Sequence, residues 1–313
     1  MILQTISLKK WFKEIGAAYF PKIRTFRHLK AIFMSSRMDF HEAIIRTTFR
    51  KYFHRDIDLE NPQTLSEKLN WLKLNNKDPL LNIVADKYAV REYVESKGLK
   101  HLLTKVIGVY ENVEDINFES LPPTFALKAT HGSGWNLIQN KGKKLSKSHM
   151  VSRIKRWLRT DMSFEKGELA YQAIKPRIII EELLDNNSKE LPDYKFFCFA
   201  GQVMFLKYIE GRFGKLTSVY LDTNWVELPF RDKKQARFPQ LPKAPTNLVE
   251  MVEAARILSQ DFPFARVDFY DIQGKTFFGE ITLYPEGGFV TLHPEKYDLK
   301  YGKLIDLTHK IKA

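Results

Sequence analysis

Two apolar segments near the C-terminal end each carry a carboxylate. They flank Asp271-Ile272-Gln273-Gly274, whose Asp, polar and Gly residues suit a tight reversal, so residues 264–288 are predicted to contain a β-hairpin. Asp268 lies in the first segment and Glu280 in the second. Burying a carboxylate is costly unless something pairs with it, and a hard divalent cation bound by oxygen ligands is one such partner. The hairpin is therefore the predicted position of the chemistry.

Two further polar residues belong to the same strands. Side chains alternate between the two faces of a strand, so Arg266 shares the face of Asp268, and Thr282 shares the face of Glu280. The hairpin would then present two acids, one guanidinium and one hydroxyl on a common surface. The sequence does not fix the strand register, so direct pairing of these residues is left open.

The composition excludes several classes of protein. A chain of 313 residues with 44% hydrophobic and 13% aromatic residues can form a large core and is not disordered. Cys198 is the only cysteine, which excludes an intramolecular disulfide, and its apolar surroundings predict a buried core residue. No apolar run reaches the length of a signal peptide or a membrane span. These features predict a cytoplasmic protein.

The positive charge is concentrated at the start of the chain. Residues 1–55 hold 12 Lys and Arg against 3 Asp and Glu, a net charge of +9 out of the total of +13. Aromatic and basic residues alternate there at roughly helical spacing, which predicts a basic amphipathic helical extension over residues 1–60. Two interpretations stay open: a helix bound to an anionic membrane surface through residues 1–55, peripheral to the inner face of the cell membrane, or a helix packed on the main domain. Nucleic acid is not expected as a partner, because no recognised motif accompanies the charge.

Several helices and strands follow from capping and periodicity. Thr64-Leu65-Ser66-Glu67 has the form of a capping box that begins a helix. A second helix is predicted from Pro79 to Gly98, within which Lys87 and Arg91 can be exposed charges, one of them paired with Asp86. The other predicted elements are strands at 102–110, 125–128, 177–184, 194–199 and 203–209, helices at 146–158 and 246–259, and a Pro-rich loop region with edge strands at 222–246.

A glycine-rich segment follows the strand that ends in Lys128. In His131-Gly132-Ser133-Gly134, the two glycines would let backbone amides approach an anion closely, with Lys128 supplying positive charge beside them. An ordinary hairpin turn is the alternative, since the spacing fits neither a Walker A loop nor a dinucleotide fingerprint. His131 is either a general base, a phosphate contact or a plain loop residue.

Two short acidic motifs can be explained without a functional role. Glu181 and Glu182 can be just the end of a strand. Asp56-Ile57-Asp58 matches the D-x-D pattern that a glycosyltransferase uses for a metal, but no buried strand precedes it, so chance is the better explanation.

Taken in order, these features resemble the ATP-grasp superfamily. The stretches QTLSEKLNWLKL, ADKYAVREYV, FALKATHGSGWNLI, DYKFFCFAGQV and FGEITLYPEGG look like its TupA-like branch, named for teichuronopeptide synthesis. The resemblance covers about Asn61 to Gly302. It implies an α+β (mixed α/β) ATP-grasp fold that holds the nucleotide between two α+β subdomains. The implied boundaries are 61–123 for the N-terminal subdomain, 124–187 for a lid with the Gly-rich loop, and 188–313 for the C-terminal, metal-binding subdomain.

The resemblance also implies roles for individual residues. Arg266 and Lys128 would be catalytic, and ATP with Mg²⁺ or Mn²⁺ would be the cofactors. Thr282 stands where many ATP-grasp ligases have Asn, which is a better metal ligand than a hydroxyl. The implied nucleotide-binding residues are Lys87, Lys128, His131, Gly132, Ser133, Gly134, Glu181, Glu182, Leu183 and Asp193, and the implied metal ligands are Asp268, Glu280 and Thr282.

The activity implied by the resemblance is that of an ATP-dependent carboxylate–amine ligase. Such an enzyme forms an acyl phosphate and joins an amino acid or amine to a carboxylate, here a uronic acid of a surface polysaccharide. An ATP-grasp kinase acting on a sugar or lipid-linked glycan is one alternative. A glycosyltransferase and a non-catalytic nucleotide-binding scaffold at the membrane are the others.

Overall fold

The computed structural model describes residues 40–142, 144–185, 191–211, 214–232 and 235–308. The chain divides into two compact units, residues 1–56 and 57–313. Within the first unit, helix α4 (Phe40–Phe53) stacks the rings of Phe49 and Phe53 with centroids 4.3 Å apart. The part of the N-terminal extension predicted over residues 1–39 lies outside the described residues. No helix among the described residues has the length and apolar character needed to cross a bilayer.

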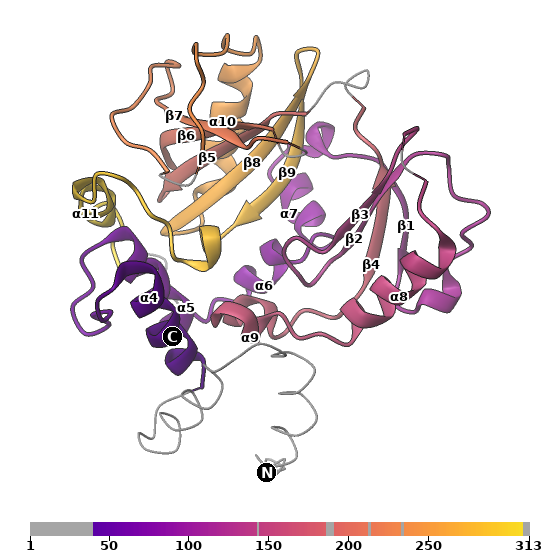
Figure 1. Cartoon of the computed structure of the whole chain (residues 1–313), viewed down its shortest axis with the longest axis horizontal. Helices are drawn as coiled ribbons and strands as arrows, with labels where there is room; N and C mark the ends of the chain where they lie inside the picture. The colour runs from indigo at the N-terminus through magenta and orange to yellow at the C-terminus, as the bar shows by residue number, and fades with distance from the viewer. Residues whose placement is uncertain (1–39, 143, 186–190, 212–213, 233–234, 309–313) are drawn as a thin grey trace. The chain divides into compact units, whose positions relative to one another are not determined.

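The second unit is built on two antiparallel sheets (Figure 1). The first has four strands in the order β1-β4-β2-β3, and the second has five strands in the order β7-β6-β5-β8-β9. The strands of the first sheet are β1 (Val106–Tyr110), β2 (Phe125–Ala129), β3 (Asn136–Gln139) and β4 (Ile178–Glu182). Those of the second are β5 (Asp193–Phe199), β6 (Gln202–Glu210), β7 (Thr217–Leu221), β8 (Phe264–Ile272) and β9 (Lys275–Thr282).

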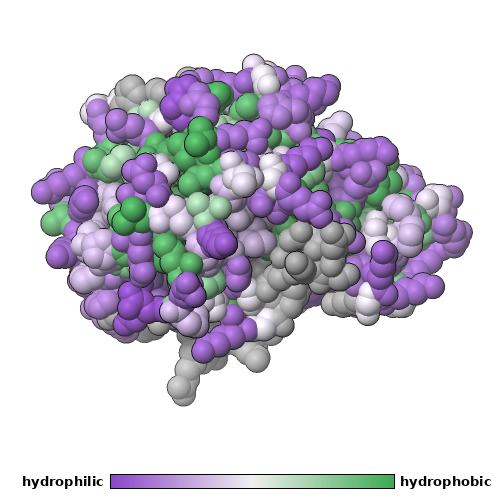
Figure 2. Space-filling model, turned by 90° about the horizontal axis from the view of Figure 1, so that it is seen from above, coloured by the Kyte–Doolittle hydropathy of each residue, from purple (hydrophilic) through white to green (hydrophobic). Residues whose placement is uncertain are grey.

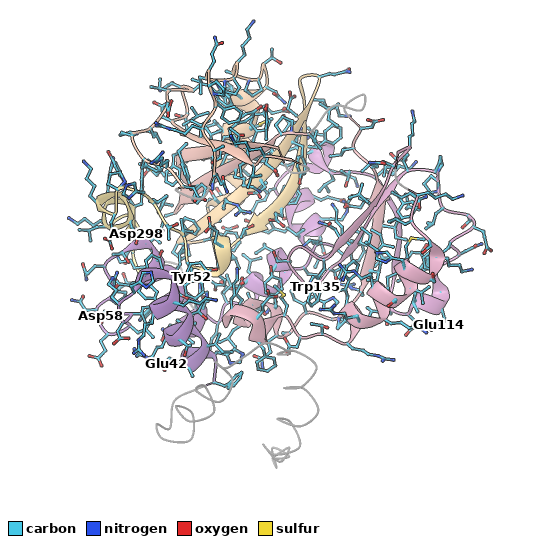
Figure 3. The ribbon with its side chains drawn as sticks, in the orientation of Figure 1. Glu42, Tyr52, Asp58, Glu114, Trp135 and Asp298 are labelled. Atoms are coloured by element: carbon cyan, nitrogen blue, oxygen red, sulfur yellow. The ribbon has the colours of Figure 1, made fainter. Side chains whose placement is uncertain are left out.

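Helices cover both sheets, and side chains fill the layers between them (Figure 3). Met150, Ile154 and Trp157 of α8 pack with the four-stranded sheet in one hydrophobic core. A larger core joins the five-stranded sheet to α5, α7 and α10. The helices of the second unit are α5 (Leu65–Asn75), α6 (Leu80–Ala85), α7 (Val90–Ser96), α8 (Lys147–Leu158), α9 (Ser163–Lys166), α10 (Leu248–Ser259) and α11 (Lys296–Gly302), with short 3-10 turns η1 (Lys100–Leu102), η2 (Val113–Asp115), η3 (Leu169–Tyr171) and η4 (Pro285–Gly287).

The predicted α+β fold is confirmed, and most predicted elements are present. The hairpins at 193–210 and 264–282 form, and each turns at two residues of positive φ: Ala200 and Gly201 in the first, Gln273 and Gly274 in the second. Cys198 is fully buried, as expected, and burial raises the pKa of its thiol to about 12. The strand predicted over 102–110 begins only at Val106. Within the described part of 222–246 there are isolated bridges and no strand.

The single helix predicted over residues 79–98 is wrong. The chain forms α6, leaves the helical path at Asp86 and resumes as α7. Asp86 causes the break, because its Oδ1 accepts hydrogen bonds from the backbone N–H of Tyr88 and Ala89, as a capping side chain does. Its Oδ2 pairs with Arg177 at 2.7 Å. The break matters because it places the next residue, Lys87, in a turn rather than on an exposed helix face.

The surface of the molecule seen from above is mostly hydrophilic, with hydrophobic side chains gathered in patches (Figure 2). Val226 and Val249 are among the exposed apolar residues, at 58% and 81%. Single exposed apolar side chains are normal for a folded protein, so they do not identify a binding surface.

The capping box predicted at Thr64 is present and gives a stability prediction. The Thr64 hydroxyl accepts from Glu67 N, and the Glu67 carboxylate accepts from Thr64 N at 3.0 Å. Thr64→Ala is expected to lower the free energy of unfolding by about 1 kcal/mol, measured by chemical denaturation. Ser152→Ala removes an exposed hydroxyl from the middle of α8 and should change the free energy of unfolding by only a few tenths of a kcal/mol. Equal effects of the two substitutions would show that the box contributes nothing.

Candidate active site

The strand register brings the polar residues of the hairpin into two cross-strand pairs. Asp268 lies opposite Glu280, and Arg266 lies opposite Thr282. A bulge between Asp268 and Phe269 accommodates Gly279, where an added Cβ would lie 3.0 Å from the Asp268 carbonyl oxygen. The glycine therefore permits the close approach of the strands that places the two acids side by side.

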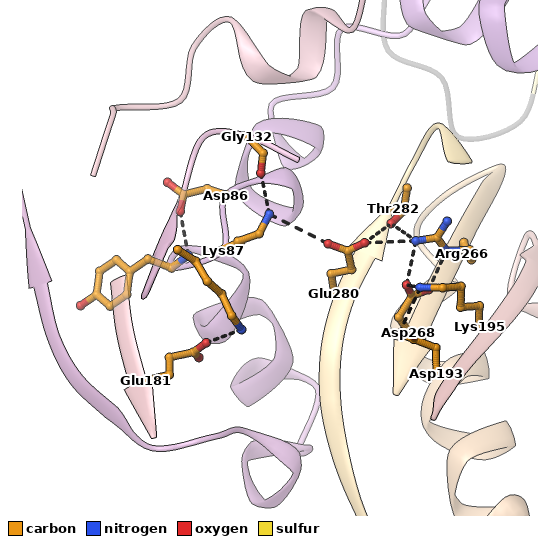
Figure 4. A network of polar contacts seen from close by, with 12 residues as sticks. Asp86, Lys87, Gly132, Glu181, Asp193, Lys195, Arg266, Asp268, Glu280 and Thr282 are labelled. Carbon is orange, nitrogen blue, oxygen red and sulfur yellow. Dashed lines mark hydrogen bonds and ion pairs between the residues drawn. The ribbon is translucent and has the colours of Figure 1, made fainter. Parts of the chain in front are cut away.

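Arg266 joins these residues into one network (Figure 4). Its Nε and Nη2 donate to the two oxygens of Asp268 at 2.6 and 2.7 Å, and Nη2 also donates to Glu280 at 3.1 Å and to Thr282 at 2.9 Å. Thr282 in turn donates to Glu280 Oε1 at 3.0 Å. Asp268 is 2% exposed, so its charge depends on these partners. The guanidinium fixes the orientation of both carboxylates.

The neighbouring strand β5 adds a lysine that sequence reasoning missed. Lys195 lies opposite Asp268 in the register, forms an ion pair with it, and lies 3.4 Å from Asp193. Lys195 and Asp193 share one face of β5, so a lysine and an acid two residues apart in an apolar strand were the available signal. They are evidence that the acids face a charged row across the sheet rather than an apolar core.

The turn between α6 and α7 supplies a second lysine from the opposite side. Lys87 Nζ donates to the Gly132 carbonyl at 2.7 Å and lies 3.9 Å from Glu280 Oε2 (Figure 4). The Lys87 backbone N–H also donates to the Thr130 carbonyl, which ties the turn to the glycine-rich loop. Burial lowers the pKa of Lys87, and Glu280 counteracts that effect. The hypothesis that Lys87 is an exposed helix charge is wrong, because 81% of its side chain is covered.

Glu181 organises a separate cluster at the end of β4. Its Oε2 accepts from Lys128 at 2.7 Å, and its Oε1 accepts from Arg91 at 3.1 Å and Thr104 at 2.6 Å. Burial raises the pKa of Glu181, but the Lys128 ammonium and the hydrogen bonds outweigh it and lower the pKa overall. Glu182, the next residue, is exposed and pairs with Lys105. The two acids thus differ: Glu181 holds the side chains of Lys128 and Arg91 in position, whereas Glu182 is exposed.

The glycine-rich loop connects β2 to β3, so it is a hairpin connection. Gly134 has φ +70°, and a Cβ on Gly132 would lie 2.4 Å from the Trp135 ring, so both positions require glycine. His131 is 3% exposed, and its Nε2 lies 2.9 Å from the Trp157 carbonyl oxygen. Burial lowers the pKa of His131.

These clusters meet at one cavity of about 220 Å³ between the two sheets. Of the residues implied by the family resemblance, Lys87, Lys128, Ser133, Gly134, Glu181, Asp268 and Glu280 line it. The other lining residues are Arg91, Thr104, Asn136, Lys195, Tyr270, Phe278 and Gly279. Four more of the implied residues contact lining residues through hydrogen bonds or ion pairs: Gly132, Arg266, Thr282 and Asp193. Among the described residues, His131, Glu182 and Leu183 are not part of the lining.

The D-x-D acids have structural contacts. Asp56 accepts from Arg50 Nε at 2.7 Å, and Asp58 accepts from the backbone N–H of Glu60 and Asn61. These contacts agree with a chance match to the glycosyltransferase pattern.

The sequence of the chain matches a known family model. The model of the TupA-like ATP-grasp family matches residues 67–306. This chain is a TupA-like ATP-grasp protein. The match includes every strand of both sheets, so the predicted superfamily and branch are confirmed. A search of curated proteins found no match to this TupA-like protein.

Solved structures give weaker similarities. A D-alanine–D-alanine ligase from Helicobacter pylori is 13% identical, with 77% of this chain and 69% of that chain aligned at a TM-score of 0.43. The enzyme of the same name from Bacillus anthracis, complexed with ATP, is 18% identical over 72% and 66% of the two chains, with a TM-score of 0.42. An L-amino acid ligase from Bacillus licheniformis is 14% identical over 81% and 56%, also with a TM-score of 0.42. The family assignment rests on the sequence match alone.

The charge on Glu280 of this TupA-like protein gives a pH prediction. Burial opposes its ionisation, but Lys87, Arg266 and Lys195 lower its pKa from 4.5 to about 2. Because the pKa of the folded state is depressed, ionised Glu280 stabilises the fold above the unfolded pKa, and this contribution is lost as the pH falls from 4.5 towards 2. The difference in unfolding free energy between the wild type and Glu280→Gln should therefore shrink over that range. Urea denaturation at several pH values measures it, and a constant difference would contradict the assigned charge network.

Proposed function

We propose that this protein is an ATP-dependent ligase that activates a carboxylate as an acyl phosphate and joins it to an amino acid or another amine. The observation that carries the proposal is the cavity, where Lys87 and Lys128 from one side face Asp268 and Glu280 from the other. Lysines can neutralise phosphate oxygens, and an acid pair can bind the cation that accompanies them. Membership in the ATP-grasp family supports ATP as the nucleotide.

For the nucleotide, we assign the phosphates to Lys87, Lys128 and the backbone amides of residues 132–134. Lys87 already contacts the loop carbonyl at Gly132, and Lys128 is held by Glu181, so both ammonium groups are positioned in advance. The end of β4, at residues 181–183, would hold the adenine through backbone atoms. Asp193, assigned to the ribose by family resemblance, is 1% exposed and held by Lys195 beside Asp268, which favours a role in ordering the acids. The subdomain boundaries at 61–123, 124–187 and 188–313 belong to the same proposal.

The acid pair fits a magnesium ion. Asp268 and Glu280 are opposite each other in the register, and Mg²⁺ is usually bound through one or two carboxylates plus substrate phosphates. Thr282 is hydrogen-bonded to Glu280 and to Arg266, so its hydroxyl orients the carboxylate and need not be a ligand itself. The bound ion would supply neutralisation of the charge on the transferred phosphoryl group.

The chain's own residues have separate tasks in the two steps. In the first step a substrate carboxylate oxygen attacks the terminal phosphorus of ATP, the bond from that phosphorus to the bridging oxygen breaks, and ADP leaves. Lys87, Lys128 and the loop hold the phosphates in line. In the second step the amine attacks the acyl carbon and phosphate leaves. Arg266, held in place by Asp268, stabilises the oxyanion that forms there. Closure of the glycine-rich loop would exclude water from the acyl phosphate.

The substrate assignment goes further than the site itself. We assign the carboxylate to a uronic acid of a surface polysaccharide, on the strength of the family resemblance. The membrane interpretation of residues 1–55 remains a prediction of the sequence.

The direct test is a product assay. The protein is incubated with ATP, Mg²⁺, glucuronic-acid oligosaccharides and a mixture of amino acids, and the products are analysed by mass spectrometry. An amide-linked product formed together with ADP and phosphate is expected. ADP with a stable phosphorylated glycan would instead establish a kinase. Nucleotide binding without consumption of ATP would favour a non-catalytic scaffold.

A further inference from the structure

Lys195 of β5 pairs with two buried acids and also borders the cavity. Its ammonium forms an ion pair with Asp268 and lies 3.4 Å from Asp193 Oδ1 (Figure 4). Both acids are buried, whereas 13% of the Lys195 side chain is exposed, and Lys195 is one of the residues that line the cavity. The same side chain therefore contacts a proposed metal ligand and borders the space assigned to the nucleotide.

The positive and negative charges around the proposed metal position balance. Arg266 and Lys195 both pair with Asp268, and Arg266 and Lys87 lie 3.1 and 3.9 Å from Glu280. A divalent ion that approaches such a cluster gains little from either carboxylate, because a cation already compensates its charge. The free metal ion is therefore expected to bind weakly unless one cation moves away. The ion pairs connect three carboxylates with three cations: Asp193, Asp268, Glu280, Lys87, Lys195 and Arg266.

Of the three cations, Lys195 is the one that can be exchanged. Arg266 donates from two nitrogens to the two oxygens of Asp268, and such a bidentate contact fixes the guanidinium. Lys87 is held by the Gly132 carbonyl, to which its Nζ donates at 2.7 Å. Lys195 carries a single ammonium on a flexible four-carbon stem, and that stem borders the cavity. Its ammonium can therefore leave Asp268 while Arg266 stays.

A second lysine limits the directions in which Lys195 can move. Lys207 of β6 lies directly opposite Lys195 in the strand register. Lys207 is buried, pairs with Asp232 at 3.1 Å and lies 5.2 Å from the centroid of the Tyr220 ring. Like charges on directly opposite residues repel each other. The side towards β6 is therefore unfavourable for the Lys195 ammonium, and the cavity is the direction left to it.

We propose that Lys195 is the counter-ion of Asp268 until the nucleotide binds, and that its ammonium then moves to a phosphate of ATP while a divalent cation takes its place at the acid pair. The inference rests on the nucleotide and metal positions proposed above. The phosphates supply the negative charge that the lysine needs, and the departure of the lysine restores the negative charge that the metal needs. Lys195 thereby couples the binding of the metal to the binding of the nucleotide.

The test measures the binding of the two ligands separately in Lys195→Met, which keeps the length of the side chain and removes its charge. Mn²⁺ is titrated into the nucleotide-free protein, and the bound ion is followed by electron paramagnetic resonance. ATP is titrated calorimetrically into the protein in the presence of EDTA. The dissociation constant for Mn²⁺ is expected to fall at least about tenfold in the variant, whereas the constant for metal-free ATP should rise at least about fivefold.

Four further variants make the result specific. Lys195→Gln keeps a hydrogen-bond donor for Asp268 and should shift both constants in the same directions, so the test does not depend on one substitution. Lys195→Arg keeps the charge and should bind Mn²⁺ more weakly than Lys195→Met. The gain in Mn²⁺ affinity should disappear in the double variant Lys195→Met/Glu280→Gln, which locates the bound ion at the acid pair. Lys155→Met removes an exposed lysine that pairs with Glu114 and should change neither constant.

The other outcomes contradict the inference in distinguishable ways. Unchanged Mn²⁺ binding in both neutral variants would show that Lys195 does not compete with the metal. Unchanged binding of metal-free ATP would exclude the transfer of the ammonium to a phosphate. Weaker binding of both ligands by a variant that unfolds at the wild-type temperature would make Lys195 a structural residue. Absence of ATP binding by the wild type would contradict the proposed function itself, before any variant is considered.

Discussion

Glu280→Gln is expected to lower Mg²⁺-dependent turnover by about 10²–10³-fold while the protein remains folded. Glu280 lies 3.1 Å from Arg266 and 3.9 Å from Lys87, and its side chain is 38% exposed towards the cavity. Glutamine keeps the shape and the hydrogen bond from Thr282 but removes one of the two charges proposed to bind the ion. ADP formation measured against Mg²⁺ concentration should show both a lower maximum and a weaker apparent affinity for the metal.

The matched control for this substitution is Glu227→Gln. Glu227 is an exposed acid that accepts from Arg237 at 3.1 Å outside the cavity lining, and its neutralisation should leave turnover unchanged. Full activity of Glu280→Gln at limiting Mg²⁺ would exclude Glu280 as a metal ligand. Thermal unfolding of both variants distinguishes a loss of chemistry from a loss of fold.

The other acid of the pair is a poorer test. Asp268 is 2% exposed and is bonded to both Arg266 and Lys195, so Asp268→Asn leaves two buried cations with less compensation. Removing one partner of a buried ion pair typically costs about 3–5 kcal/mol. A loss of activity in Asp268→Asn would therefore mix a missing ligand with a destabilised sheet. In the sequence the two acids look equivalent, but the structure shows that Asp268 is almost completely buried whereas the Glu280 side chain is 38% exposed.

Lys128→Ala is expected to weaken ATP binding by about 10- to 150-fold, which corresponds to about 1.5–3 kcal/mol for a hydrogen bond to a charged group. The Lys128 ammonium lines the cavity and is held at 2.7 Å by Glu181. The substitution should cost little stability, since Glu181 keeps its contacts with Arg91 and Thr104. Isothermal titration of Mg-ATP into the variant gives the dissociation constant.

Lys147→Ala is the control for Lys128. Lys147 is exposed at the start of α8 and pairs with Glu119, so its removal changes the net charge equally without touching the cavity. A dissociation constant for ATP that shifts equally in the two variants would indicate a general charge effect. An unchanged constant in Lys128→Ala would contradict the assignment of this lysine to the phosphates.

Local signals predicted the hairpin that carries Asp268 and Glu280 well. Acids inside apolar strands, a turn at Asp271–Gly274 and strict alternation are short-range features, so the hairpin and its faces followed from them. The direct pairing of Asp268 with Glu280 could not be predicted from these features, because it depends on a bulge at Gly279 that shifts the register by one residue. The register is set by the contact between two strands, which the pattern of either strand alone does not contain.

The features that the sequence did not predict depend on contacts between residues far apart in the chain. The helix pattern runs through Asp86, and it is broken by a side-chain cap together with an ion pair to Arg177, far along the chain. Lys195 was not singled out, since its role depends on β5 lying next to β8. The ion pairs of the Glu181 side chain with Arg91 and Lys128 were not predicted either. In each case the partner comes from a distant part of the sequence.

The central claim is that ATP activates a carboxylate at this site, and the transfer of oxygen tests it most directly. Glucuronic-acid oligosaccharides labelled with ¹⁸O in the carboxylate are incubated with the protein, Mg-ATP and the amino-acid mixture, and the inorganic phosphate is analysed by mass spectrometry. Passage through an acyl phosphate predicts one ¹⁸O atom in the released phosphate for each amide formed. Phosphate without ¹⁸O, or label retained in a stable phosphorylated glycan, would contradict the claim.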